Sequence, residues 1–173
     1  HPIEENIRQT NRVAELLRRP LPADFQAQFA RRTRDAFAAG LTTVPGVEAV
    51  LDALTVPCGV ASNGNRAKVD FTLGHTGLRR RFESRIFTAD DVPHPKPAPD
   101  LFLHVARTLG VTPTRTTVVE DTPTGITAAR AAGMQVIGYA AMTPASRLQD
   151  AGADAIALTM PEVLALLKRR GAA

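Results

Sequence analysis

The chain has little of several residue types, and each shortage excludes a class of protein. Only one of its 173 residues is a cysteine, Cys58, so the chain cannot form a disulfide framework. Cys58 lies in the apolar run 56–61, where we expect a small core residue rather than a catalytic thiol. No apolar run approaches the length of a membrane span. We therefore expect a cytoplasmic protein with no membrane partner.

Aromatic residues are scarce as well, at 5% of the chain with no Trp. The formal net charge is +4, but the Arg-rich clusters at 79–81 and 168–170 are short. Surfaces that bind nucleic acids usually combine a longer basic stripe with aromatic side chains for stacking. We expect no nucleic-acid partner, and the positive charge favours anionic small molecules instead. The sequence does not indicate an oligomeric state.

What the chain does contain is a regular alternation of apolar strands and amphipathic helices, preceded by two helices without a strand. The first two helices are predicted over residues 3–19 and 23–39. Further helices are predicted over residues 47–54, 65–75, 98–109, 124–132, 144–151 and 161–170. Strands are predicted over residues 56–61, 85–88, 116–120, 135–139 and 155–158. This alternation predicts an α/β fold with a parallel sheet covered by helices on both faces.

Ligands of such folds bind beyond the carboxyl ends of the strands, and two of these ends carry residues suited to an anion. Ser62, Asn63 and Gly64 follow the first strand and precede a helix, an arrangement that offers a hydroxyl, an amide and backbone N–H groups. The same residues are also common in ordinary turns. Lys96 stands between Pro95 and Pro97, which limit its freedom and favour a fixed positive charge beside a phosphate.

A third strand end carries Glu120 and Asp121, directly after the apolar residues of the strand. Two carboxylates there are costly without a counter-charge, and a divalent cation such as Mg²⁺ prefers carboxylate oxygens. A helix N-cap is the alternative, and it accounts for one acid better than for two. Together the three strand ends supply an anion site, a positive charge and a metal site, which is the set that phosphoryl transfer requires.

These motifs resemble the haloacid dehalogenase superfamily of hydrolases, in the branch of phosphatases and phosphomutases with a helical cap. Residues 60–64, 94–100 and 118–125 look like its second, third and fourth motifs. The resemblance implies a Rossmann-like α/β core over residues 44–173 and part of a small all-helical cap over residues 1–43.

The resemblance also implies the roles of individual residues. The catalytic residues would be Ser62 and Lys96, and the phosphate would be bound by Ser62, Asn63, Gly64 and Lys96. Mg²⁺ would be bound by Asp121 directly, with Glu120 as a ligand or a neighbour of the ion. Asn63 would assist phosphate binding or contact the substrate.

One part of the family's pattern is absent, namely the first motif, in which a strand ends in Asp-x-Asp-Gly. Its first Asp is the nucleophile and its second the general acid-base. Asp90 and Asp91 lie in a predicted loop, and Asp24 and Asp35 lie in predicted helices, so none replaces it. In the family this strand lies between the strands that end here at Ser62 and Glu120. Because the chain also begins at His1 without Met, we expect that the native protein has a further N-terminal segment with this strand.

The expected function is a Mg²⁺-dependent phosphatase that hydrolyses a small phosphorylated metabolite through an aspartyl-phosphate. Residues 57–64 look closest to sugar-phosphate phosphatases such as those that act on 6-phosphogluconate. Dehalogenases typically lack the metal-binding pair, so Glu120 and Asp121 argue against that reaction. A phosphomutase of the β-phosphoglucomutase type is one alternative. The other is a catalytically inactive binding or regulatory protein, if these 173 residues are the whole product, and we expect them to be inactive by themselves.

Overall fold

The computed structural model describes residues 22–173, and the helix expected over residues 3–19 lies outside the described residues. The chain divides into two compact units after Leu41. In the first unit, α2 (Phe25–Gly40) is the helix expected over residues 23–39. The rings of Phe25 and Phe29 stack with their centroids 6.0 Å apart, because residues four apart lie on the same side of a helix.

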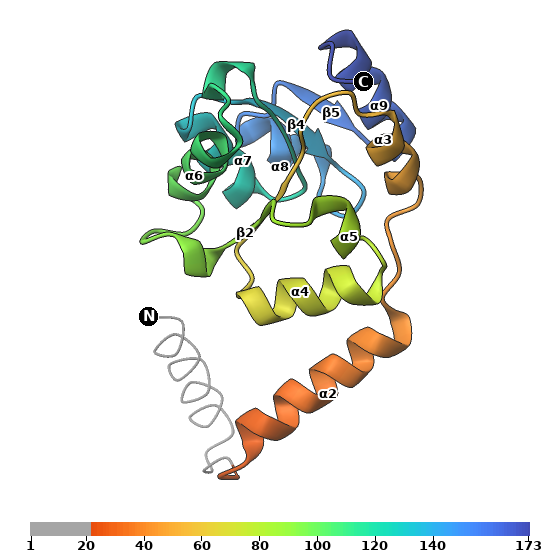
Figure 1. The fold of residues 1–173 in the computed structure, drawn as a ribbon, viewed down its shortest axis with the longest axis vertical. Helices are drawn as coiled ribbons and strands as arrows, with labels where there is room; N and C mark the ends of the chain where they lie inside the picture. The colour runs from red at the N-terminus through yellow and green to blue at the C-terminus, as the bar shows by residue number, and fades with distance from the viewer. Residues whose placement is uncertain (1–21) are drawn as a thin grey trace. The chain divides into compact units, whose positions relative to one another are not determined.

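The second unit, residues 42–173, contains the alternating elements (Figure 1). Its helices are α3 (Val47–Ala53), α4 (Arg66–His75), α5 (Arg79–Phe82), α6 (Asp100–Leu109), α7 (Pro123–Ala131), α8 (Ala145–Asp150) and α9 (Met160–Arg169). Its strands are β1 (Val60–Ser62), β2 (Ile86–Thr88), β3 (Thr117–Glu120), β4 (Gln135–Tyr139) and β5 (Ala155–Ala157). Two 3-10 turns, η1 (Ala89–Asp91) and η2 (Pro113–Arg115), complete it.

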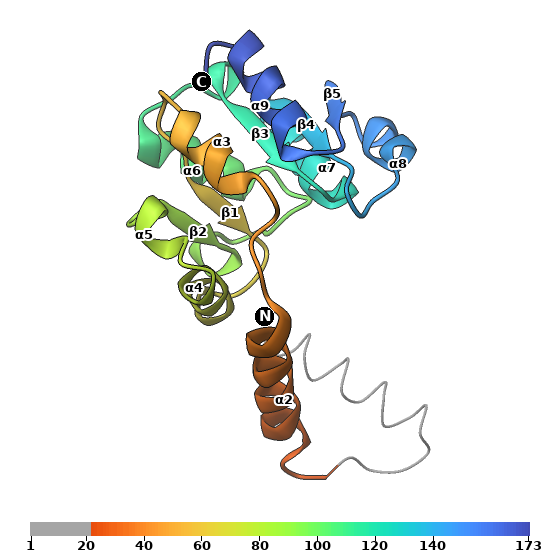
Figure 2. The same ribbon diagram turned by 90° about the vertical axis from the view of Figure 1, so that its right-hand side faces the viewer.

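All strands pair in parallel, as the sequence predicts, but they form two sheets (Figure 2). One sheet is β1–β2, and the other has the order β3–β4–β5. Within residues 22–173, β1 pairs only with β2, and β3 pairs only with β4. Each of β1 and β3 therefore has one edge without a strand partner in the described part of the chain.

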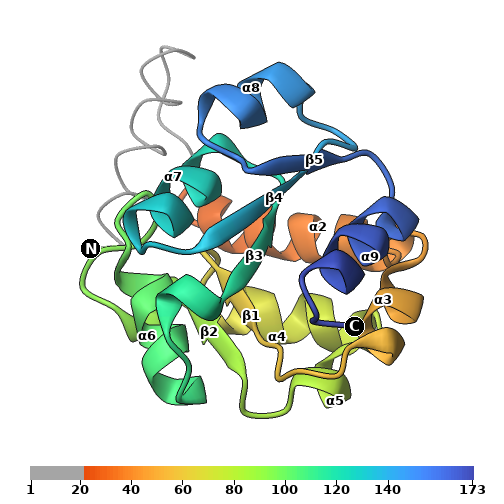
Figure 3. The ribbon, with the colours of Figure 1, turned by 90° about the horizontal axis from the view of Figure 1, so that it is seen from above.

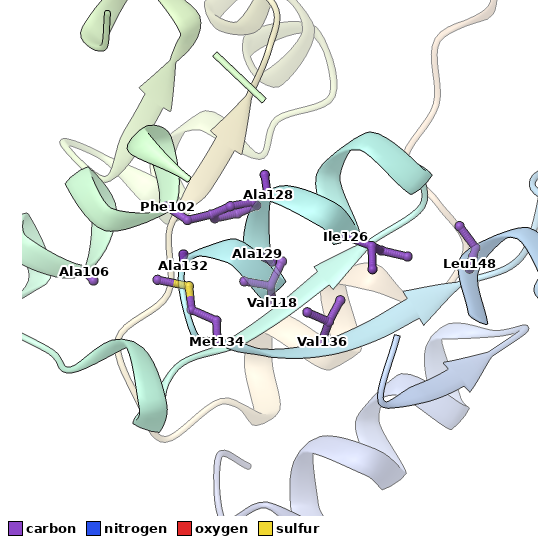
Figure 4. Packing of buried hydrophobic residues seen from close by; sticks show 10 residues of the cluster. All are labelled: Phe102, Ala106, Val118, Ile126, Ala128, Ala129, Ala132, Met134, Val136 and Leu148. Atoms are coloured by element: carbon purple, nitrogen blue, oxygen red, sulfur yellow. The ribbon is translucent and has the colours of Figure 1, made fainter. Parts of the chain in front are cut away.

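Helices cover both faces of the three-stranded sheet (Figure 3), because consecutive strand residues point to opposite faces. Val136 of β4 packs among residues of α6, α7 and α8. Phe102, Ala128 and Met134 belong to the same cluster, and Met134 is drawn below the other two in Figure 4. The next residue, Ile137, packs on the other face against residues of α3 and α9. The period-two pattern that predicts the strands thus places the core on both sides of the sheet.

The first strand begins later than predicted. The run 56–61 was expected to be the strand, whereas β1 covers only Val60–Ser62. Pro57 has no N–H to donate to a ladder, and Val56 is 43% exposed. At Gly59 the backbone passes so close to the Arg85 carbonyl that a Cβ would lie 2.9 Å from its oxygen. Cys58 is half-buried beside the apolar cluster of α4, α5 and β2, as expected of a small packing residue.

Membrane-spanning length is not reached by any helix in the part of the chain that the structure describes.

Candidate active site

The turn after β1 orients the hydroxyl group of Ser62. The Gly64 N–H donates a hydrogen bond to Ser62 Oγ at 3.1 Å. Since Oγ acts as the acceptor here, the hydroxyl hydrogen can be donated to another group. A Cβ at Gly64 would lie 3.3 Å from both Ser62 Oγ and a methyl group of Val69, so the turn has little room for a side chain. Asn65 then caps α4 by accepting the Lys68 N–H at 2.9 Å.

Lys96 lies in the extended segment between β2 and α6, followed by a cis peptide bond to Pro97. Its side chain is buried, with 6% exposed. The ammonium donates to the Ala61 carbonyl of β1 at 2.9 Å and to Glu120 Oε1 of β3. The ring of Phe102 lies below it, with Nζ 4.7 Å from the ring centroid. A negative charge, a carbonyl dipole and an aromatic face therefore hold the ammonium in one place.

Glu120 is the last residue of β3, and its carboxylate is fixed by its own neighbours. One oxygen accepts from Lys96, and the other accepts from the Thr122 hydroxyl at 3.1 Å. Thr122 is also the N-cap of α7, where its Oγ1 accepts from the Gly125 N–H at 3.1 Å. The carboxylate lies directly against Gly125, because a Cβ there would be 2.1 Å from Glu120 Cδ. Only glycine at position 125 leaves room for the carboxylate in this place.

Asp121 follows Glu120 and is exposed. Within residues 22–173, no group of three or more His, Cys, Asp or Glu side chains gathers as a metal cluster. Mg²⁺ is usually held by only one or two protein carboxylates, together with water and substrate phosphate oxygens. Two adjacent carboxylates at a strand end fit that ion, with Asp121 exposed and Glu120 already bound to Lys96.

Three of the predicted site residues, Asn63, Lys96 and Glu120, come together across the break between the two sheets. Lys96 contacts the strand ends of both β1 and β3, and so links the loop of Ser62 to the loop of Glu120. The Asn63 side chain binds the main chain of Lys96 at both ends of its amide, at 2.9 and 3.0 Å. Ser62 and Asp121 are neighbours of these residues in the chain, and the structure gives no direct contact between them.

Three residues of this region carried no assigned role in the sequence analysis. Thr122 and Phe102 position Glu120 and Lys96, respectively. The Thr-Pro pair at 122–123 is a recognisable helix start that could have indicated Thr122, whereas nothing local marks Phe102. The third residue is Arg66, whose guanidinium donates to the Ile86 carbonyl at 2.7 Å and pairs with Asp91 at 2.6 Å.

Asp90 and Asp91 serve the local structure after β2. Asp90 accepts the Arg66 N–H at 2.8 Å, and Asp91 accepts both the N–H and the hydroxyl of Thr88. Burial of Asp91 raises its pKa, but the hydrogen bonds from Thr88 and the Arg66 guanidinium outweigh burial, so that its pKa is lowered. These contacts join the end of β2 to the start of α4 and support the expectation that neither acid replaces the missing nucleophile.

Parallel strands with helices on both faces, and polar residues gathered at the carboxyl ends of the strands, define the class of α/β proteins that bind ligands at that edge. A family model described as haloacid dehalogenase-like hydrolase matches residues 4–133. The chain belongs to this family of hydrolases.

Individual relatives support this assignment. Fructose-1-phosphate phosphatase YqaB of Escherichia coli (strain K12) is 46% identical over 81 residues, which are 47% of this chain and 43% of that protein. Beta-phosphoglucomutase of Mycobacterium bovis is 34% identical over 135 residues, covering 72% of this chain and 51% of that protein. The chain thus spans about half, or less, of the length of these curated relatives.

The fold has solved counterparts as well. A family hydrolase from Deinococcus radiodurans R1, crystallised with bound phosphate and sodium, is 29% identical with a TM-score of 0.79. The similarity covers 94% of this chain and 74% of that one.

Proposed function

We propose that the protein to which this chain belongs is a Mg²⁺-dependent phosphatase that hydrolyses a small phosphomonoester, with a sugar phosphate as the substrate class. The observation that carries this proposal is the position of Lys96, a buried cation between the Ser62 turn and the Glu120-Asp121 strand end. A hydroxyl donor, a fixed cation and two carboxylates at one sheet edge suit the stabilisation of a transferring phosphoryl group. The relative named as a fructose-1-phosphate phosphatase supports both the reaction and the substrate class.

Phosphate binding is assigned to Ser62, Asn63, Gly64 and Lys96. The Ser62 hydroxyl donates to a phosphoryl oxygen while its own oxygen is oriented by the Gly64 N–H. The Lys96 ammonium neutralises the charge of the phosphoryl group and retains its other contacts. Asn63 assists from the same turn through the hydrogen bonds of its side chain with the Lys96 main chain. The solved hydrolase of this fold that was crystallised with bound phosphate supports phosphate as a ligand.

Mg²⁺ is assigned to Asp121, with Glu120 as a second ligand or a neighbour of the ion. The exposed Asp121 carboxylate is ready to bind the ion, and Glu120 is held in place by Lys96 and Thr122. When bound, Mg²⁺ would offset the negative charge of the phosphoryl oxygens and of the attacking group.

The nucleophile is assigned to an Asp on a further strand between β1 and β3, as the family resemblance implies. Two features support this strand. The facing edges of β1 and β3 have no strand partner within residues 22–173. Val119 of β3 is also 39% exposed, whereas Ile137 beside it on β4 is fully buried. One more strand beside β3 would help to bury Val119. The Asp carboxylate would attack phosphorus while the second Asp of the same motif protonates the leaving alcohol. Water, deprotonated by that second Asp, would then hydrolyse the aspartyl-phosphate to inorganic phosphate and restore the carboxylate.

A phosphomutase of the β-phosphoglucomutase type is the second candidate, and the mycobacterial relative of that name favours it. A mutase needs the same phosphate and metal residues, but must protect its phosphorylated intermediate from water. The phosphatase is preferred because the relative of that name has the higher identity. A cytoplasmic location and a small metabolite as partner complete the proposal.

The test is hydrolysis of p-nitrophenyl phosphate by the full-length gene product, with Mg²⁺ and with Mg²⁺ removed by EDTA. We expect hydrolysis only with Mg²⁺, and none from residues 1–173 alone. Activity that is unaffected by EDTA would refute the metal assignment. Incubation with glucose phosphates separates the candidates, because a mutase yields an isomer and a phosphatase yields free phosphate. Binding of these esters without any turnover by the full-length product would identify an inactive binding protein.

A further inference from the structure

The Asn63 side chain uses both ends of its amide on the main chain of one distant residue. Its Nδ2 group donates to the Lys96 carbonyl at 2.9 Å, and its Oδ1 accepts the Lys96 N–H at 3.0 Å. The two residues are 33 positions apart in the chain. A short side chain with both a donor and an acceptor is required for this pair of bonds, and among the amino acids asparagine meets that requirement best.

The segment that receives these bonds has few other means of being fixed. Pro95, Pro97 and Pro99 have no N–H groups, so Lys96 carries the only backbone donor between Pro95 and Pro97. Lys96 also lies outside the strands, and thus gains no ladder hydrogen bonds. The Asn63 amide supplies both bonds that an adjacent strand would otherwise make. Contacts with Ala61, Glu120 and Phe102 then hold the far end of the side chain.

Asn63 is also the residue directly after Ser62. Bonds from Asn63 to Lys96 therefore fix the Lys96 backbone relative to the Ser62 turn, and with it the spacing between a hydroxyl and an ammonium group. A phosphoryl group contacted by both must find them at a set separation, and a misplacement of about 1 Å can cost about 100-fold in rate.

We propose that Asn63 is a positioning residue, which holds Lys96 in register with Ser62 by two main-chain hydrogen bonds, rather than a side-chain ligand of the phosphate. This inference rests on the proposed function, in which Lys96 acts on the phosphoryl group. The Asn63 side chain then affects the rate only through Lys96, and removal of Asn63 should matter only when the lysine side chain is present.

A double-mutant cycle with Asn63→Ala and Lys96→Ala in the full-length gene product tests this dependence. We expect Asn63→Ala to lower kcat/KM for p-nitrophenyl phosphate by about 10- to 100-fold, but by less than about 2-fold when Lys96 is already alanine. The same fold-loss in both backgrounds would mean an independent contact with phosphate and would overturn the proposal. Unchanged kcat/KM in Asn63→Ala would overturn it as well.

A second measurement reports the position of Lys96 without activity. In protein with lysines labelled with ¹³C at Cε, we expect the neighbouring Phe102 ring to shift the Lys96 signal, which is identified by its loss in Lys96→Ala. We expect Asn63→Ala to move this signal toward those of exposed lysines, and an unmoved signal would overturn the proposal. If the wild-type protein hydrolyses no phosphomonoester, the proposed function fails, while this signal still decides the contact between Asn63 and Lys96.

Asn65→Ala is the matched control, since Asn65 lies two residues away and caps α4. Loss of the cap should lower the melting temperature. However, kcat/KM should change by less than about 2-fold, and the Lys96 signal should not shift. Equal effects of Asn65→Ala on kcat/KM would show that general loosening of the turn is responsible, and would count against a specific role of Asn63.

Discussion

The Lys96 ammonium and the Glu120 carboxylate form an ion pair between the two sheets, with 6% and 10% of their side chains exposed. Taking two charges out of water is costly, and here the carbonyl of Ala61, the hydroxyl of Thr122 and the ring of Phe102 compensate. The pair therefore connects stability and function, because the residues that hold the site also join the two halves of the core.

The loss of one partner should be worse for stability than the loss of both. Lys96→Met leaves the Glu120 carboxylate buried and unpaired, which costs roughly 3–5 kcal/mol. The double variant Lys96→Met with Glu120→Gln leaves no buried charge, and should recover most of this loss. Urea unfolding of the full-length gene product measures both values. Additive losses from the two substitutions would argue against the buried pair.

Asp121 should control the response to Mg²⁺. Asp121→Asn removes the charge that binds the ion while it retains the size of the side chain, so we expect a loss of about 100-fold or more in phosphatase kcat/KM. Titration calorimetry with Mg²⁺ should show weaker binding. Asp150→Asn is the matched control, because Asp150 is an exposed acid at the end of α8. If Asp121→Asn retains the Mg²⁺ response of the wild type, another residue holds the ion.

Gly125 should be required for both function and stability. A methyl group at position 125 overlaps the Glu120 carboxylate, which must turn away and release Lys96. Alanine favours helices over glycine by only up to about 1 kcal/mol, which does not offset the loss of the buried pair of Lys96 and Glu120. Gly125→Ala should therefore unfold at a lower temperature than the wild type, and kcat should fall at least about tenfold. Gly74→Ala in α4 has open space around its Cβ, and should stabilise the protein with unchanged kcat. Normal kcat in Gly125→Ala would show that Glu120 is free to move without consequence.

Acid should weaken the contact between Arg66 and Asp91. Because the pKa of Asp91 is lowered in the folded protein from its ordinary 3.8, the carboxylate stabilises the fold fully above that pH. The contribution disappears as the pH falls through the lowered pKa. The difference in unfolding free energy between the wild type and Asp91→Asn should thus be constant well above pH 3.8 and should shrink below it. A difference that grows on acidification has the wrong sign for this contact.

The sequence predicts most elements of the second unit because their signals are local. The apolar run of β4, the Pro and Thr at the start of α7, and the Gly110 that ends α6 each act within a few residues. The same local pattern predicts the first strand too early, since the apolar run 56–61 looks like a strand although Pro57 has no N–H for a ladder and pairing with β2 begins only at Val60.

The sequence by itself determined that Ser62, Glu120 and Asp121 lie at the ends of parallel strands and that Lys96 lies in the proline-rich loop before α6, because strand and turn signals fix where each chain segment stops. Only the tertiary structure decided what each of them contacts. Lys96 binds Ala61, Glu120 and the Asn63 amide, partners that are 24 to 35 residues away. Such contacts depend on how the two sheets and α6 pack together, and no local propensity encodes that arrangement.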